Sequence, residues 1–459
     1  MFILMVVVFV LGYTAIALEH PLKVDKAASA LIIGTLCWVL YILGAEDILH
    51  LGFSPSWAAF VASHPDVHGI HAVHDFIVDY EIIHHLGEIS EILFFLLGAM
   101  TIVEVVDQHD GFKIITDKIK TTNKVKLLWI LSFLTFFMSA LLDNLTTTIV
   151  IVALLRKLVD DKETRWFFAS MVVLAANAGG AWSPIGDVTT IMLWIGGQIT
   201  AGGIIVNVFL PSLVAAIVPM VILSLTMKGN ITRPKIDNDE VEYTTQYERI
   251  LFLVIGISGL LFVPIFKTVT HLPPYMGMLL SLGVIWVISE VVHKDKPLYI
   301  KEKLKVVAIL RKVDVPTVLF FLGILSAVAA LQSAGHLNIM ATFLDKNLEN
   351  VYLIDLAIGV LSSIVDNVPL VAGSMGMYPI AEAGAVGRDV LFMQNGIFWE
   401  FLAYTAGTGG SILIIGSAAG VAAMGLEKID FIWYMKKISL LAIVGYLAGA
   451  GTYYLMFGL

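Results

Sequence analysis

Cysteine is almost absent from this chain of 459 residues, and Cys37 is the only one. A single Cys excludes an intrachain disulfide framework and a thiolate metal cluster. Charge is scarce too, since Asp, Glu, Lys and Arg together make up 14% of the residues and 58% are hydrophobic. No basic patch indicates nucleic acid as a partner. Apolar residues spread over the whole length predict a polytopic protein embedded in a lipid bilayer.

Long apolar runs divide the chain into candidate spans. Four runs are interrupted by polar residues: 127–158 and 351–380 carry Asp-Asn at their centres, and 166–198 and 391–424 carry Gly-rich centres. The run at the N-terminus is expected to be a retained helix, because no basic segment precedes it as in a signal peptide. The uninterrupted runs, each long enough for a hydrocarbon core of about 30 Å, are 1–18, 28–44, 87–106, 204–227, 250–266, 275–292, 315–332 and 431–457.

The Lys and Arg residues predict how these runs are oriented. With the N-terminus outside, only Lys267, Lys346 and Arg388 of the 28 Lys and Arg residues lie outside, provided that 127–158 enters and leaves on one face. The same count makes 351–380 a hairpin that enters from the other face. The predicted fold is an all-α polytopic membrane protein with about ten membrane crossings, two opposed re-entrant hairpins and two broken helices. Both termini are predicted outside.

The matching order of elements predicts an inverted-topology repeat. Polar residues 228–248 are interpreted as a cytoplasmic linker, and the basic segment 297–313 as an amphipathic helix on the cytoplasmic surface. The predicted repeats are 1–227, with hairpin 127–158 and broken helix 166–198, and 249–459, with hairpin 351–380 and broken helix 391–424.

Two similar strings lie at matching places in the two hairpins: SALLDN at 139–144 and SSIVDN at 362–367. A carboxylate in hydrocarbon costs several kcal/mol unless something compensates it. No interrupted run carries a Lys or Arg near its centre, so a structural ion pair is not expected for Asp143 or Asp366. The matching carboxylates therefore predict an ion site.

The broken helices supply oxygen ligands. Their centres read NAGGAWSPIGDVTT at 177–190 and TAGTGGSILIIGS at 405–417, rich in side-chain oxygen and free of sulfur and imidazole. Where a membrane helix unwinds, its backbone groups must face protein, water or an ion. Small hard cations prefer such oxygen-rich surroundings. Asp187 adds a third membrane carboxylate.

The buried carboxylates indicate an exchange mechanism. Burial penalises the charged form, so either a proton or a cation neutralises it, and the two compete for the same oxygens. A carrier that reorients only when the site is filled exchanges one for the other. Two alternatives remain: a cation-coupled symporter of a small anion such as a dicarboxylate, and an intramembrane hydrolase with paired Asp. No His-Glu-x-x-His helix or nucleophile motif supports the hydrolase.

Five segments carry a family resemblance: HHLGEISEILFFLLGAMTIVEVVD at 84–107, SALLDNLTTTIV at 139–150, NAGGAWSPIGDVTTIMLW at 177–194, SSIVDNVPL at 362–370 and TAGTGGSILIIGSAAG at 405–420. In these segments, which extend over nearly the whole chain, the sequence resembles the NhaD-type sodium/proton antiporters of the ion transporter superfamily. The resemblance implies export of Na⁺ or Li⁺ in exchange for H⁺ across the cytoplasmic (inner) membrane, with no cofactor. It also implies a homodimer and an elevator-type motion of the hairpins and broken helices.

The resemblance also implies which residues bind the ions. Na⁺ or Li⁺ is expected at Asp143, Asp187 and Asp366. Related carboxylate carriers have neutral residues at the hairpin tips, so the Asp residues here favour protons over organic anions. The remaining candidates are Asn144, Asn177, Thr189, Thr190, Ser362 and Asn367, together with Thr408, Ser411 and Ser417, which match less closely because the second gap is longer. Whether Asn144 and Asn367 are ligands or helix caps is left open.

Residues 45–86 contain no Lys or Arg but seven of the twelve His residues. His64, His68, His71 and His74 are spaced to share one helical face, which leaves three interpretations: a solvated extracytoplasmic loop, a pH sensor or a metal site. The third span carries further candidates for pH sensing or ion access, at the outer end His84, His85, Glu88 and Glu91, and at the inner end Glu104.

Overall fold

The structure is a computed structural model that describes residues 1–17, 19–64, 69–116, 118–234, 243–348 and 350–458. These residues form helices, with two isolated β-bridges, which confirms the all-α prediction. Eight of the described helices are long and apolar enough to cross a membrane. They are α3 (Lys26–Leu43), α7 (Ile82–Gln108, preceded by the π-helical turn η1, Phe76–Glu81), α9 (Lys124–Leu142), α13 (Ala201–Thr226), α14 (Gln246–Thr270), α15 (Pro274–Val292), α18 (Val315–Ser333) and α25 (Ser439–Phe457).

Helix α1 (Phe2–Ala17) follows the predicted first span up to residue 18, which lies outside the described residues. One of the predicted simple spans differs from the structure. The predicted span 431–457 is two helices, α24 (Phe431–Lys437) and α25. The basic residues Lys436 and Lys437 interrupt the apolar run there, so the long apolar helix begins only after them.

Both Asp-Asn runs are helix pairs that break at the predicted residues. The first hairpin is α9 and α10 (Asn144–Leu158), and the second is α20 (Val351–Leu361) and α21 (Asn367–Met377). In the first, the ends meet again: Lys124 Nζ donates to Thr164 Oγ1 at 3.2 Å, just beyond the end of α10. In the second, the Tyr378 hydroxyl after α21 donates to Asp345 before α20 at 2.9 Å. Each pair therefore enters and leaves on one side.

The two hairpins open at opposite ends of α13. The ends of the first hairpin lie beside the chain after α13, where the Asp160 N–H donates to Thr232 O at 2.9 Å. The chain after the second hairpin returns to the start of α13, where Asn395 N–H donates to Gln198 O at 2.8 Å. With 26 residues, α13 separates the two openings by about 39 Å. These contacts support the inverted repeat, whose boundaries stay a prediction.

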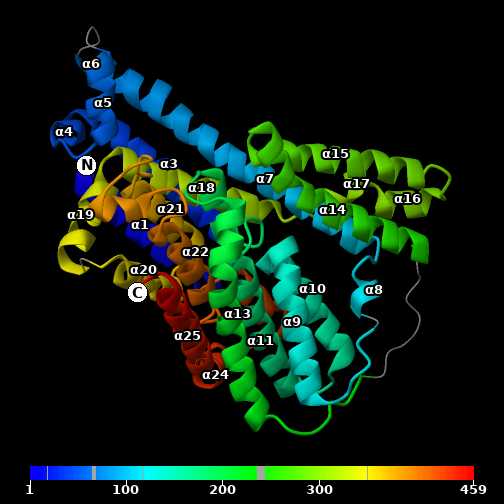
Figure 1. Ribbon diagram of the computed structural model, residues 1–459. Coiled ribbons are helices and arrows are strands. Elements are labelled where there is room, and N and C mark those ends of the chain that lie inside the picture. Colours follow the sequence, from blue (N-terminus) through cyan, green and yellow to red (C-terminus); the bar gives the residue numbers. More distant parts are fainter. Residues whose placement is uncertain (18, 65–68, 117, 235–242, 349, 459) are drawn as a thin grey trace.

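The Gly-rich runs are helices with a break. The first consists of α11 (Lys162–Ala181) and α12 (Val188–Ile195), and the second of α22 (Ile397–Gly409) and α23 (Ala418–Glu427). The halves of the chain pack crosswise, because α12 contacts α21 of the second hairpin and α23 contacts α10 of the first. Figure 1 shows α11 and α22 near the middle of the molecule, with the long α7 running past them toward α14 and α15.

Glycine allows each hairpin to approach its broken helix closely. A Cβ on Gly179 would lie 2.2 Å from the carbonyl oxygen of Phe136, and one on Gly409 would lie 2.0 Å from that of Gly359. Only glycine fits where a helix backbone contacts another backbone this closely. The same contact therefore occurs once in each half of the chain.

The predicted amphipathic helix over 297–313 is wrong, because Lys305 is extended (φ −65°, ψ 138°) and separates α16 (Leu298–Leu304) from α17 (Val306–Ile309). Residues 235–242 of the predicted linker lie outside the described residues. The remaining short helices are α2 (Glu19–Leu22), α4 (Ala45–His50), α5 (Pro55–Ser63), α6 (Gly69–Asp75), α8 (Lys113–Thr116), α19 (His336–Leu348) and the 3₁₀ turn η2 (Gly387–Phe392).

Candidate functional site

Four half-helices start at predicted site residues. Asp143, Asp187, Asp366 and Ser417 are the N-caps of α10, α12, α21 and α23, and each side chain accepts a hydrogen bond from a first-turn backbone N–H. The first N–H groups of a helix carry partial positive charge and favour a nearby anion. The Asp residues, and not the Asn residues that follow them, are therefore the caps of the hairpin helices.

Asp187 is the most enclosed of the three carboxylates, at 1% exposed. Its Oδ1 accepts hydrogen bonds from the backbone N–H of Thr189 at 2.9 Å and from the Thr189 hydroxyl at 2.8 Å. Its Oδ2 accepts one from Asn144 Nδ2 at 2.5 Å. All three donors are neutral, so they stabilise the carboxylate without cancelling its charge. A buried anion in this setting needs a proton or a cation for compensation.

Asn177 connects Asp187 to the other half of the chain. Its Oδ1 accepts a hydrogen bond from Asn144 Nδ2 at 3.0 Å, and its Nδ2 donates to the hydroxyls of Ser411 and Ser417, both at 2.9 Å. We call these five side chains, Asn144, Asn177, Asp187, Ser411 and Ser417, the Asp187 network. All five were predicted site residues, and all are buried.

Asp143 lies beside the network without a hydrogen bond to it. Both of its carboxylate oxygens are used within α10, since Oδ1 accepts from the Thr146 N–H at 2.7 Å and Oδ2 from the Thr146 hydroxyl at 2.8 Å. The negative charges of Asp143 and Asp187 repel each other. Its φ of 82° is rare for a residue with a Cβ and costs about 1–3 kcal/mol. Such strain at a hairpin tip indicates a constraint on where this carboxylate points.

A small cavity adjoins Asp143. Its volume is about 20 Å³, and its other walls are apolar, including Phe95 and Met278. About one water or one ion of similar size fits such a space.

Asp366 has a cationic partner, which the sequence analysis did not expect. Lys26 Nζ, from the first residue of α3, lies 3.9 Å from Asp366 Oδ2, and the side chains are 21% and 16% exposed. Lys26 comes from a different helix in the other half of the chain, so the residues of the interrupted runs do not reveal this partner. The negative charges of Asp143 and Asp366 both interact with that of Asp187, so the three carboxylates are electrostatically coupled.

Some predicted site residues have other roles. Ser362 and Thr408 donate to the backbone carbonyls of Ala406 at 2.8 Å and Tyr404 at 2.5 Å. Thr190 donates to the backbone carbonyl of Asp187 at 2.8 Å. Ser362 therefore holds the second hairpin against α22, and Thr190 shapes the start of α12. Thr408 bonds within its own helix and does not join the Asp187 network.

Several buried polar atoms near the site have no hydrogen-bond partner. They are Nδ2 of Asn367 and the hydroxyls of Thr147 and Thr148. Asn367 was predicted and is an electrostatic neighbour of Asp187. The two Thr residues were not singled out, although they stand in the SALLDNLTTTIV segment. Similar unpartnered hydroxyls occur elsewhere in the described residues, at Ser132, Ser212 and Ser439, so these atoms by themselves do not mark the site.

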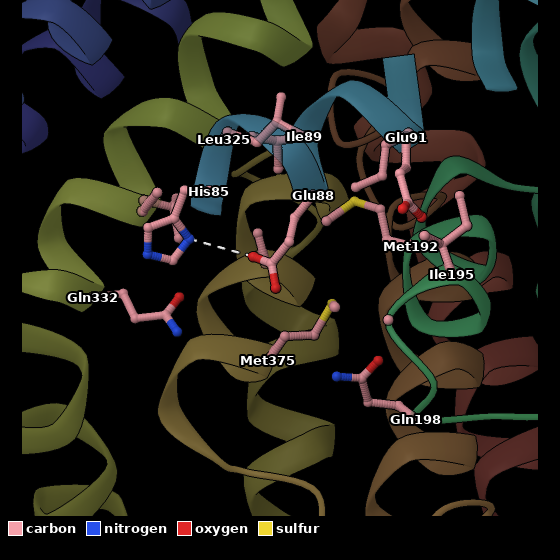
Figure 2. A pocket seen from close by; sticks show the side chains of 15 residues that line it. His85, Glu88, Ile89, Glu91, Met192, Ile195, Gln198, Leu325, Gln332 and Met375 are labelled. Carbon is pink, nitrogen blue, oxygen red and sulfur yellow. Dashed lines mark hydrogen bonds and ion pairs between the residues drawn. The ribbon is translucent and has the colours of Figure 1, made fainter. Parts of the chain in front are cut away.

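A cavity of about 320 Å³ lies between α7 and α18 on one side and α12 and α21 on the other. His85, Glu88 and Glu91 line it, as Figure 2 shows. His85 Nδ1 lies 3.3 Å from Glu88 Oε2, and Met192 of α12, five residues after Asp187, closes the far wall. The cavity thus extends from the first turns of α7 to the second half of α12, which begins directly after Asp187.

The other titratable candidates of α7 do not line this cavity. His84 is exposed on the helix surface and lies 3.4 Å from Glu88 Oε1. Glu104 lies at the opposite end of α7, where its Oε1 accepts a hydrogen bond from Gln108 at 2.9 Å.

The predicted histidine face is wrong for the described part of the chain. His64 is the C-cap of α5, where that helix ends, so it does not share a helix with His74 of α6. His68 lies outside the described residues. Among the described residues, no group of three or more His, Cys, Asp or Glu side chains is arranged to hold a metal ion.

The matched sequence profile is that of the citrate transporter family, over residues 1–407. Sodium/proton antiporter 1 of Arabidopsis thaliana is 45% identical over 98% of this chain and 71% of that protein, and sodium/proton antiporter 2 of the same plant is 42% identical over 98% of both. Na⁺/H⁺ antiporter NhaD of Vibrio parahaemolyticus is 31% identical over 76% of this chain and 86% of that protein. The chain belongs to the NhaD-type sodium/proton antiporter family. Because the relatives of this NhaD-type protein are named as transporters, the prediction of a transporter is confirmed over that of a hydrolase.

Proposed function

We propose that this NhaD-type protein exchanges Na⁺ or Li⁺ for H⁺ across a membrane, and that the Asp187 network is where cation and proton compete. One observation carries the assignment. Asp187 is a fully enclosed carboxylate with neutral hydrogen-bond donors only, at the point where the half-helices of both halves of the chain meet. A charge so enclosed binds one positive particle at a time, and either a proton or an alkali cation meets that requirement.

The residues around Asp187 have separate tasks in this proposal. Asp187 binds the cation or the proton, and the hydroxyls of Ser411 and Ser417 offer further oxygen ligands. Asn144 and Asn177 hold these oxygens in place through their amide hydrogen bonds. Asp143 and Asp366, at the two hairpin tips, bind or relay the second charge. The transported ions are substrates, and the exchange needs no cofactor.

The cavity lined by His85, Glu88 and Glu91 is the proposed entrance to the site. Its two carboxylates attract cations, and its inner wall belongs to α12, whose first residue follows Asp187. The hairpins and broken helices pack on one another crosswise, which suits an elevator-type motion of these parts against α3, α7 and α18. We further propose a homodimer in the cytoplasmic (inner) membrane with both termini outside.

Transport by the reconstituted protein tests the function. Purified protein is placed in vesicles with a pH-sensitive dye and an imposed acid gradient, and NaCl, LiCl, KCl or sodium-free citrate is added separately. Collapse of the gradient by Na⁺ or Li⁺ supports antiport. Dissipation with citrate alone, without a response to Na⁺ or Li⁺, would instead support the anion symporter.

Substitutions in the same assay test the site. Asp187→Asn, Asp143→Asn and Asp366→Asn are each expected to abolish exchange while the protein is still recovered as a monodisperse peak. Wild-type turnover in Asp187→Asn would overturn the assignment of the Asp187 network.

A further inference from the structure

The two hairpin tips carry the same Asp-Asn pair but differ three residues after the Asp. In the first hairpin this residue is Thr146, whose N–H and hydroxyl occupy both oxygens of Asp143. In the second hairpin it is Pro369, which has neither a backbone N–H nor a hydroxyl. The first tip therefore satisfies its carboxylate from within its own helix, and the second tip does not.

Asp366 consequently has one oxygen left for a partner outside the hairpin. Its Oδ1 accepts a hydrogen bond from the Val368 N–H at 3.2 Å, and its Oδ2 faces the Lys26 ammonium at 3.9 Å. Lys26 Nζ also lies 4.5 Å from the centre of the Phe320 ring of α18. The ammonium is thus placed by α3 and α18, while the carboxylate belongs to the second hairpin.

The distance between Lys26 and Asp366 is long for an ion pair with a direct hydrogen bond, which is about 2.7–2.9 Å. The contact is therefore loose, and the cost of breaking it is small, in line with the low energies of partly exposed pairs. A third group lies nearby: the Tyr13 hydroxyl of α1 is buried and interacts with both the charge and the backbone of Asp366. A cation that replaced the ammonium would find two oxygens there, one from Asp366 and one from Tyr13.

We infer that Lys26 is a tethered counter-ion which occupies Asp366 in the absence of substrate and which the transported cation displaces. The inference rests on the proposed function. Because Lys26 belongs to α3, outside the hairpins, its displacement also removes one electrostatic tie between α3 and the second hairpin. Lys26 is thus a residue that sets the apparent affinity for the transported cation and links occupancy to movement of the hairpin.

The test compares Lys26→Gln, Lys26→Arg and, as a matched control, Lys23→Gln. Lys23 is exposed in the same connection before α3, so its loss removes the same charge from the same region without touching Asp366. The readout is the apparent KM for Na⁺ in the vesicle assay at one fixed pH. Removal of the competitor is expected to lower the apparent KM by about three- to tenfold in Lys26→Gln, because about 1.4 kcal/mol corresponds to a factor of ten. Lys26→Arg and Lys23→Gln are expected to stay within about twofold of wild type.

A second readout separates affinity from folding. The melting temperature of each variant in detergent is followed as NaCl replaces choline chloride, and the concentration of Na⁺ that gives half of the stabilisation should fall in Lys26→Gln alone. An unchanged or raised apparent KM in folded Lys26→Gln would overturn the inference, since a purely positioning Lys leaves or weakens Na⁺ binding when removed. If wild-type protein shows no Na⁺-driven proton flux, the proposed function itself fails, which is a distinct result.

Discussion

Asn177 is the residue on which both halves of the site depend. Its amide holds Asn144 on one side and the hydroxyls of Ser411 and Ser417 on the other. Removing one partner of a buried hydrogen bond costs about 1–3 kcal/mol, and about 1.4 kcal/mol is a tenfold change in rate. We therefore expect Asn177→Ala to slow Na⁺-driven proton flux by at least about tenfold, as measured by the dye response in vesicles. A rate within twofold of wild type would show that the bridge is dispensable.

Thr408 is a control for Asn177, because it is also a buried candidate from the sequence. Its hydroxyl donates only to Tyr404 O in its own helix, and Val has nearly the same shape. Thr408→Val should therefore leave the rate and the apparent KM for Na⁺ within about twofold of wild type, with a stability change of about 1 kcal/mol or less. Loss of transport in a well-folded Thr408→Val protein would mean that the network extends further along α22 than the hydrogen bonds indicate.

The sequence identified most residues of the site but not their contacts. Asp143, Asp187 and Asp366 could be predicted because an uncompensated carboxylate in an apolar run is costly and therefore informative. The pairing of Asp366 with Lys26 could not, because the two residues lie in different halves of the chain and only packing of α3 beside the second hairpin brings them together. Thr147 and Thr148 could have been noticed in the sequence, because they form a run of three Thr residues with Thr146 shortly after the Asp-Asn pair.

At the scale of helices, the close backbone contact between α20 and α22 leaves no room for a side chain at the contact point. A Cβ on Gly409 would lie 2.0 Å from the backbone oxygen of Gly359, and one on Gly425 of α23 would meet open space. Gly409→Ala should therefore separate the second hairpin from α22 and lower the melting temperature sharply. Gly425→Ala should leave it unchanged or raise it slightly, because Ala favours a helix over Gly by about 1 kcal/mol. Equal melting temperatures for the two variants would contradict this packing.

A buried histidine pair joins the C-terminal ends of α7 and α15. His109 and His293 approach at 3.3 Å between their Nε2 atoms, and His109 stacks on Phe252 with ring centres 3.6 Å apart. Burial lowers the pKa of His109 to about 4, and burial also lowers the pKa of His293. Both rings are thus kept neutral in the folded protein.

This pair predicts a pH dependence of stability. A His whose folded pKa is below its unfolded value of about 6.5 contributes fully above that pH and loses its contribution as the pH falls toward the folded pKa. For His109 the loss at pH 5 is about 2 kcal/mol. The melting temperature should therefore be lower at pH 5 than at pH 7.5, and His109→Gln should show a smaller difference between the two. If the melting temperature changed equally between pH 5 and pH 7.5 in wild type and His109→Gln, protonation of His109 would not be the cause.

Helix order could be predicted from apolar run lengths, and helix ends could not always be. The hairpin breaks fall at the predicted Asp-Asn pairs because polar residues there cap the following helices. The prediction of one helix over 297–313 was wrong because helical periodicity does not reveal the extended Lys305 between α16 and α17. The predicted histidine face was wrong for the same reason: regular spacing continues across the end of α5, although the helix does not.

At the scale of the whole molecule, the two halves of the chain are tied together at both ends of the site. On one side, Glu427 after the second broken helix pairs with Arg156 at 2.8 Å and Arg165 at 2.9 Å, both from the first half. On the other, Asn207 of α13 donates to both oxygens of Glu400 at 2.9 Å. The site therefore lies within one interlocked body, in which the broken helices and hairpins of the two halves are expected to move together.

The account depends most on competition between a proton and an alkali cation at Asp187. The direct measurement is proton release when NaCl is added to purified, detergent-solubilised protein in weakly buffered solution, followed with a pH-sensitive dye against choline chloride as the blank. Wild-type protein should release protons on binding Na⁺ or Li⁺, and Asp187→Asn should release none. No release from transport-competent wild type, or equal release from Asp187→Asn, would contradict the central claim.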